Sequence, residues 1–135
     1  MENAVKIARQ LGHAIQEADF YKKLNAAKEK ADADETLQAL IALFNSKRVA
    51  INNEACKQDR DEEALKTLNE EMRTVYSQIM SNENMAAYNT AKQSFDSSLQ
   101  RLVTIVTNSA EGEDPDTTDF DPSCTHDCST CGGCH

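Results

Sequence analysis

The first 110 residues contain no proline and a single glycine, Gly12, whereas both prolines and the other three glycines lie in the last 25 residues. Proline and glycine are the residues that most disfavour helix interiors, so their near absence over this length favours long helices. We therefore predict a helical body that ends between Ala110 and Gly112. With 135 residues, the chain is long enough for one domain with a modest core.

Apolar residues recur every three or four positions in the first part of the chain, as they do on one face of an amphipathic helix. One such segment covers residues 3–18, and a second starts at Asp19, a suitable N-cap, and ends near Asp32. Asp32 and Glu35 have the spacing of a capping box, in which each side chain satisfies amide groups of the first helical turn. This pair predicts the start of a longer third helix.

The third and fourth predicted helices have about 20 residues each, which corresponds to a length of about 30 Å. Residues 57–63 contain no large apolar side chain and are expected to form the loop between them, with Asp59 or Asp61 as the next N-cap. The fourth helix has the apolar spacing of an antiparallel coiled-coil seam, at Leu65, Leu68, Met72, Val75 and Ile79. The two helices are therefore predicted to pair as a hairpin.

A break at residues 81–84 precedes a fifth apolar stripe, which continues to Val106. The predicted fold is all-α: an antiparallel bundle of about five helices with a long protruding hairpin, followed by a disordered tail. Residues 1–110 contain only six Phe and Tyr and no Trp, so the core is thin. We expect a second subunit to bury part of the stripes, which predicts a dimer.

Acidic residues dominate the end of the chain: residues 111–135 carry seven acids and neither Lys nor Arg, against a net charge of −9 overall. Residues 111–123 have the composition of a disordered acidic linker, with Phe120 as its one expected anchor. An acidic balance argues against direct nucleic-acid binding and against docking to an anionic membrane. The sequence shows neither a signal peptide nor a membrane span, so we expect a cytoplasmic protein without membrane insertion.

Residues 124–135 hold four of the five cysteines and two of the three histidines. The cysteines have the spacing C-x3-C-x2-C-x2-C, which lets one loop place its sulfurs around a common centre: Cys124, Cys128, Cys131 and Cys134. In a reducing compartment, clustered cysteines bind metal or carry out redox chemistry more often than they form structural disulfides. The sequence therefore predicts a metal-binding tail.

A [4Fe-4S] or related iron–sulfur cluster is the first choice, because Cys124, Cys128 and Cys131 share one tight loop and each thiolate can take a separate iron. The fourth ligand is Cys134, His126, His135 or a cysteine of a partner subunit. Zinc is the main alternative, since four cysteines, or three with one histidine, are ordinary zinc ligand sets.

Other interpretations of the tail stay open. Residues 131–135 match the C-x-x-C-H signature of covalent haem attachment, which is expected in exported proteins. The C-x-x-C pairs also suit a thiol switch, although no strand–helix context surrounds them to lower a thiol pKa. An unmetallated tail is the remaining alternative.

The helical body offers no catalytic set. Cys56 is a lone cysteine near the end of the third helix, which is typical of a small packing residue, and His13 is expected on or near the surface. No nucleophile–base pair or glycine-rich phosphate loop has a recognisable spacing. We therefore expect a protein that is not an enzyme.

Several short pieces of the chain match a known family: Ala8-Arg-Gln-Leu11 with Ile15, Ala18-Asp-Phe-Tyr21 before Leu24 and Ala27, and Ala33-Asp34 before a long helix. The leucine-spaced helix from Leu65 to Ile79 and the Asn-containing break before Tyr88 match as well. On these features the chain, over roughly residues 4 to 108, resembles the YlbF/YmcA family of small bacterial helical regulators.

The resemblance implies an all-α fold with a protruding hairpin, no enzymatic activity, and assembly as a homodimer or as a hetero-oligomer with related helical proteins. It also implies roles in competence, sporulation and biofilm control, and an association with mRNA processing by a membrane-anchored endoribonuclease. Some members have iron–sulfur clusters held by tail cysteines. For this chain, that property extends only to Cys124, Cys128, Cys131 and Cys134.

Overall fold

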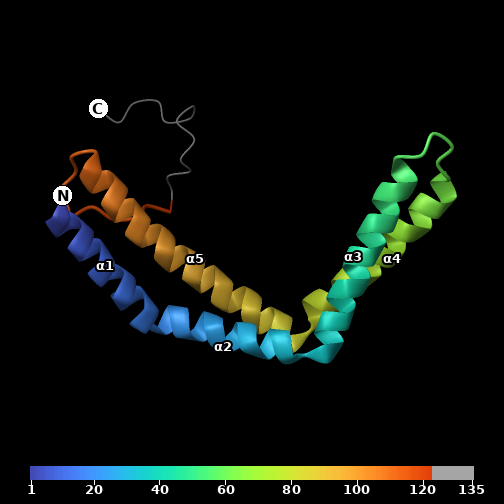
Figure 1. The fold of residues 1–135 in the computed structure, drawn as a ribbon, viewed down its shortest axis with the longest axis horizontal. Coiled ribbons are helices and arrows are strands. Elements are labelled where there is room, and N and C mark those ends of the chain that lie inside the picture. Colours follow the sequence, from blue (N-terminus) through green and yellow to red (C-terminus); the bar gives the residue numbers. More distant parts are fainter. Residues whose placement is uncertain (123–135) are drawn as a thin grey trace. The chain divides into compact units, whose positions relative to one another are not determined.

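The computed structural model describes residues 1–122, and within that range it contains five α-helices and no β-strand. The helices are α1 (Glu2–Glu17), α2 (Asp19–Ala33), α3 (Glu35–Ala55), α4 (Glu62–Ser81) and α5 (Glu83–Ala110) (Figure 1). The all-α prediction is confirmed. The chain divides into two compact units, Met1–Phe95 and the residues from Asp96 onward, and each is described by itself. None of these helices combines the length and hydropathy that a membrane span requires.

Two predicted helix starts were misplaced by one or two residues. Asp19 is the first residue of α2 rather than its N-cap, which is the extended residue Ala18. Asp32 lies in the last turn of α2 and does not cap α3. The N-cap of α3 is Asp34, whose side chain accepts a hydrogen bond from the Leu37 amide at 3.0 Å, because α2 continues as far as Ala33.

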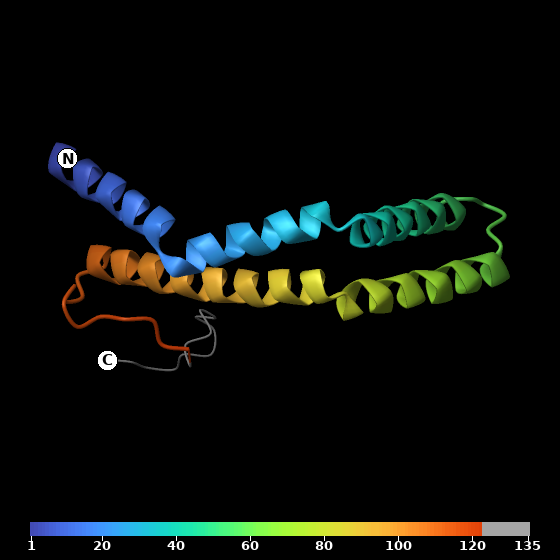
Figure 2. The same cartoon turned by 90° about the horizontal axis from the view of Figure 1, so that it is seen from below.

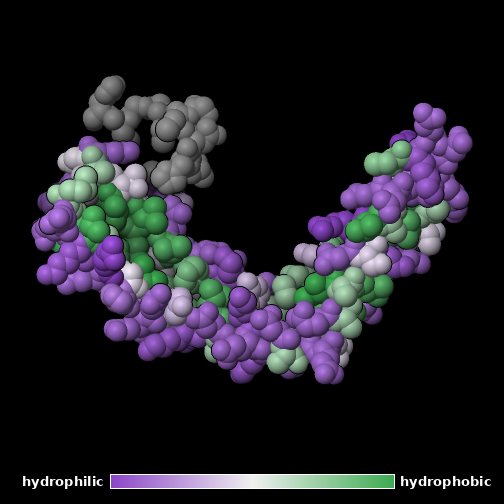
Figure 3. Space-filling view, viewed as in Figure 1, coloured by the Kyte–Doolittle hydropathy of each residue, from purple (hydrophilic) through white to green (hydrophobic). Residues whose placement is uncertain are grey.

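The third and fourth helices form the predicted antiparallel hairpin (Figures 1 and 2). Asp61 caps α4, as expected, by accepting hydrogen bonds from the amides of Glu63 at 3.0 Å and Ala64 at 3.1 Å. Glu54 accepts a hydrogen bond from the Asp61 amide across the connecting loop at 2.9 Å. Figure 3 shows that hydrophilic side chains cover the loop end of the hairpin, so the apolar contacts lie toward its base.

The core of the Met1–Phe95 unit lies at the base of the hairpin. Its centre is Leu37, the largest fully buried side chain, with Ala31 of α2 and Val75 and Ile79 of α4 around it. Five partly buried residues pack against this cluster: Leu40, Ile41, Phe44, Met85 and Tyr88. Four helices therefore share one small core, and the expectation that the core is thin is met.

A network of hydrogen bonds centred on Asp34 joins the helix ends around this core. One carboxylate oxygen of Asp34 accepts from the Leu37 amide, and the other accepts from the side-chain amides of Asn82 at 3.0 Å and Asn84 at 2.9 Å. Asn82 in turn accepts a hydrogen bond from the Met85 amide at 3.0 Å. The start of α3 is thus connected directly to the break between α4 and α5.

The first turns of α5 lie beside α2 (Figure 2). Phe20 of α2 and Phe95 of α5 have ring centroids 5.8 Å apart with tilted planes, a favourable aromatic geometry. Ala27 is buried on the same side of α2. Small side chains and one aromatic pair therefore hold this part of α5 in the unit.

We expect Leu37→Ala to lower the free energy of unfolding by about 3 kcal/mol, because it removes a fully buried side chain and leaves a cavity. Leu37→Met keeps most of the volume and is expected to cost less than about 1.5 kcal/mol. Urea denaturation followed by circular dichroism measures both. Equal losses for the two variants would contradict the assignment of Leu37 as the centre of the core.

Asp34 should make the stability of the helical body depend on acid pH. Hydrogen bonds from Leu37, Asn82 and Asn84 lower the pKa of the Asp34 carboxyl from its ordinary value of 3.8 to about 2. A carboxyl with a depressed pKa stabilises the fold fully above its unfolded pKa, and that contribution disappears as the pH falls through the folded pKa. The stabilisation should therefore be lost between about pH 4 and pH 2.

Asp34→Ala should lower Tm by a few degrees at pH 7, and this difference from the wild type should shrink toward pH 2. The matched control is Asp32→Ala, which removes an exposed acid from the preceding turn. Thermal melts across this pH range test the prediction. A difference in Tm that stays constant from pH 7 to pH 2 would show that the Asp34 carboxylate does not act through its charge.

Candidate functional site

The predicted metal ligands lie outside the residues that the structure describes. Cys124, Cys128, Cys131, Cys134, His126 and His135 all belong to residues 123–135. The chemistry of this donor set, four thiols and two imidazoles, fits both an iron–sulfur cluster and a zinc ion. The metal-binding tail stays a prediction.

Within residues 1–122, no group of three or more His, Cys, Asp or Glu side chains is placed to hold a metal ion. His13 is exposed on α1, as expected. Cys56 follows the last residue of α3 and is also exposed. The interpretation of Cys56 as a packing residue was therefore wrong, because α3 ends one residue before it, at the start of a solvent-exposed loop.

The segment that leads to the tail folds back on the end of α5. Gly112 has φ of 102°, a conformation that glycine adopts without strain. Its amide donates to the Ser109 carbonyl at 3.2 Å, and the Glu113 amide donates to the Asn108 carbonyl at 3.0 Å. These two bonds are those of a Schellman motif, which ends a helix and reverses the chain. Residues 113–120, here called the strap, therefore run back along α5 (Figure 2).

Hydrogen bonds give the strap a defined shape. The Asn108 side-chain amide donates to the Thr118 hydroxyl at 2.9 Å, and that hydroxyl donates to Glu113 at 2.5 Å. The Asp114 carboxylate accepts from the Asp116 amide at 3.0 Å. The composition predicted a disordered linker here, whereas the structure gives residues 113–120 defined hydrogen bonds, including contacts to α5.

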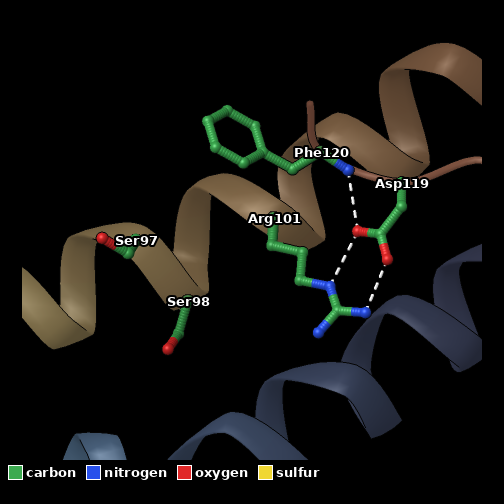
Figure 4. Close-up of a pocket in the computed structure, with 5 residues that line it drawn as sticks. All are labelled: Ser97, Ser98, Arg101, Asp119 and Phe120. Atoms are coloured by element: carbon green, nitrogen blue, oxygen red, sulfur yellow. Dashed lines mark hydrogen bonds and ion pairs between the residues drawn. The ribbon is translucent and has the colours of Figure 1, made fainter. Parts of the chain in front are cut away.

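The strap also forms an ion pair with α5. Arg101 donates two hydrogen bonds to the Asp119 carboxylate, at 2.7 and 2.5 Å (Figure 4). The hydrogen bond from Arg101 is the main reason that the pKa of Asp119 lies below its ordinary value, and the Phe120 amide, which donates to the same carboxylate at 2.7 Å, lowers it further. The same pairing raises the pKa of Arg101.

Phe120 is half-buried beside the same stretch of α5. It lines an open pocket together with Ser97, Ser98 and Arg101, and its ring points along the helix toward Ser97 (Figure 4). The expectation that Phe120 anchors the linker agrees with this position. The ion pair of Arg101 with Asp119 was not predicted from the sequence. A signal for it was present, because Arg101 is the last Lys or Arg of the sequence and a cluster of acidic residues follows it in the strap.

A second hollow lies between α2 and the first turns of α5. Alanines from both helices line it, and Lys23 and Lys30 lie at its sides. Alanine side chains allow two helices to approach closely, so this groove is explained by helix packing.

A model of the family described as "Control of competence regulator ComK, YlbF/YmcA" matches residues 5–110. A UPF0342 protein from Caldicellulosiruptor bescii is 27% identical over 114 residues, which are 84% of this chain and 93% of that protein. No solved structure matches. The family match ends where α5 ends, so it covers all five helices and leaves out the strap and the cysteine-rich residues. The chain belongs to the YlbF/YmcA family of regulators of the competence regulator ComK.

Proposed function

We propose that this chain is a regulatory protein that acts by assembling with partner proteins and carries an iron–sulfur cluster on its cysteine tail. The observation that carries the proposal is the cysteine spacing of Cys124, Cys128, Cys131 and Cys134, placed after a helical body of a regulator family. Regulation fits the family description, and the cluster fits the donor set. Zinc bound by the same residues, or an unmetallated tail, is the alternative.

The tail residues would act as ligands, and the residues around them would tune the site. Deprotonated thiolates of the four cysteines would hold the irons, with His126 or His135 as alternative ligands for the last position. An iron–sulfur cluster would supply one-electron redox chemistry and sensitivity to oxygen. Five acidic side chains lie shortly before the first cysteine, four in the strap and one just after it: Glu113, Asp114, Asp116, Asp119 and Asp121. Their negative charge would disfavour reduction of the cluster.

Assembly with other proteins has support in both units. In the first unit, Val5 and Ile7 of α1 are exposed, and within the described residues none of the α1 side chains is buried. In the second unit, Val103 and Val106 of α5 are 50% and 58% exposed. Val103 and Val106 lie three residues apart and thus on one face of α5, and exposed apolar side chains on one face favour a protein–protein interface. The proposed partners are a second copy of the chain or related helical proteins.

Anaerobic reconstitution tests the cluster. The wild type should bind iron and acid-labile sulfide in about equal amounts and become brown, because bridging sulfides accompany the irons in such clusters. Cys124→Ser, Cys128→Ser and Cys131→Ser should each lose most of the iron and sulfide. Cys134→Ser should do so as well unless a histidine takes the fourth position.

Cys56→Ser is the matched control, because Cys56 is an exposed cysteine of the helical body. It should keep the wild-type content of iron and sulfide. Zinc is assayed in the same samples. Stoichiometric zinc without acid-labile sulfide in the wild type would reject the iron–sulfur proposal in favour of the zinc alternative.

A further inference from the structure

The hairpin formed by α3 and α4 carries two exposed arginines that have no acidic partner in the described part of the chain. They are Arg48 of α3 and Arg73 of α4, and neither forms an ion pair within residues 1–122. The neighbouring cation Lys47 is paired, because Glu71 reaches it across the hairpin. Two exposed guanidinium groups are thus left to bind an anion from outside this part of the chain.

The two arginines lie at the same level of the hairpin. The ring centroids of Phe44 and Tyr76 are 6.1 Å apart, which places these residues opposite each other in the antiparallel pair (Figure 2). Arg48 follows Phe44 by four positions, so it lies one turn closer to the loop on the same face of α3. Arg73 precedes Tyr76 by three positions and lies one turn closer to the loop on α4. Both cations therefore lie one turn from the same aromatic pair.

An exposed apolar surface continues from these arginines along α4. Tyr76 is 53% exposed and Met80 is 42% exposed. They follow Arg73 by three and seven positions, so the three side chains share one face of the helix. The surface made by Arg48, Arg73, Tyr76 and Met80, here called the basic–aromatic face, thus combines positive charge with apolar area.

Acidic side chains of the hairpin do not neutralise this face. On α3, no Asp or Glu lies three or four positions from Arg48, the spacing at which helix side chains meet. On α4, Glu71 lies about 200° around the helix from Arg73 and pairs with Lys47. Glu70 lies three positions before Arg73 and is exposed, but no ion pair joins the two. The face therefore stays positive in a protein whose net charge is −9.

We propose that the basic–aromatic face binds a helix of a partner protein that presents acidic residues and a large apolar residue on one side. Arginine holds a carboxylate through two parallel hydrogen bonds, and Tyr76 and Met80 offer contact to the apolar residue. Because the arginines lie one turn from Tyr76, the acid of the partner helix should lie three or four positions from its apolar residue. This inference rests on the proposed assembly with partner proteins and is independent of the cysteines.

An acidic helix fits the face better than a nucleic acid does. Nucleic acids gain their affinity from many contacts between basic residues and phosphates, whereas this face holds two arginines in an acidic protein. The apolar area of Tyr76 and Met80 instead suits the apolar side of an amphipathic helix. Single-stranded RNA, which also combines negative charge with stacking groups, is therefore the competitor to include in the test.

Two synthetic peptides test the face. Both are alanine-based helices of about 18 residues, a length at which an isolated helix forms. The first carries leucines and glutamates four positions apart, and the second has glutamine in place of each glutamate. The full chain should bind the glutamate peptide with a Kd about tenfold or more below that of the glutamine peptide, measured by fluorescence anisotropy. Added NaCl should weaken this binding, because salt screens the attraction between arginine and carboxylate.

Substitutions on the hairpin separate charge from apolar contact. Arg48→Glu/Arg73→Glu should raise the Kd for the glutamate peptide about tenfold or more, and this variant should prefer a peptide with lysine in place of glutamate. Tyr76→Ala should weaken the glutamate and glutamine peptides alike, because both use the same apolar contact. All four side chains of the face are at least partly exposed, and circular dichroism checks that each variant stays helical.

Lys22→Glu/Lys28→Glu is the matched control, because it makes the same change in net charge on exposed residues of α2. It should change the Kd for the glutamate peptide by less than about twofold. Equal Kd values of the wild type for the glutamate and glutamine peptides would overturn the proposal, as would a loss in the control as large as in the arginine variant. Tighter binding of a labelled uridine oligonucleotide that needs the same arginines would also overturn it, in favour of RNA.

The same samples distinguish this face from the rest of the proposed function. Sedimentation equilibrium without peptide measures self-assembly, and iron and sulfide are assayed alongside. A chain that assembles and holds its cluster but does not bind the glutamate peptide rejects the basic–aromatic face alone. A chain that binds the peptide through the arginines but holds no iron supports the face and rejects the iron–sulfur cluster alone.

Discussion

The Asp34 carboxylate is the contact on which the helical body depends. It caps α3 through the Leu37 amide and accepts the side-chain amides of Asn82 and Asn84, so it joins the two ends of the hairpin at its base. Because three donors converge on one ionised group, these hydrogen bonds are charge-assisted and stronger than those between neutral groups. Leu37, three residues after Asp34, is placed by this cap at the centre of the core.

A polar junction of this kind compensates for a core of few large side chains. The buried cluster around Leu37 consists of Ala31, Val75 and Ile79, and the contact between α2 and α5 relies on alanines and the pair of Phe20 and Phe95. With so little apolar area, helix directions are fixed less by packing than they are in a larger domain. Hydrogen bonds at the helix ends help to fix the helix directions, since a hydrogen bond weakens steeply when the angle at its donor falls below about 120°.

The helices could be predicted from the sequence because their signals are local. The apolar spacing from Leu65 to Ile79, the cap at Asp61 and the break before Met85 each depend on residues within a few positions of one another. The choice between Asp32 and Asp34 as a cap could not be made in this way. It depends on Asn82 and Asn84, which are distant in the sequence and favour Asp34 only once the hairpin has formed. The same limit applies to the pairing of Arg101 with Asp119.

Charge and composition predict a linker after α5. A few specific residues nevertheless fix the position of this segment. Gly112 reverses the chain, and Arg101, the last basic residue of the sequence, pairs with one acid among many. Arg101 pairs with Asp119, and because both side chains are exposed to water, this ion pair adds little to stability. The position of the strap is therefore specific but weakly held. In the sequence, a segment with these two properties lies between the helical body and the residues that carry the four clustered cysteines.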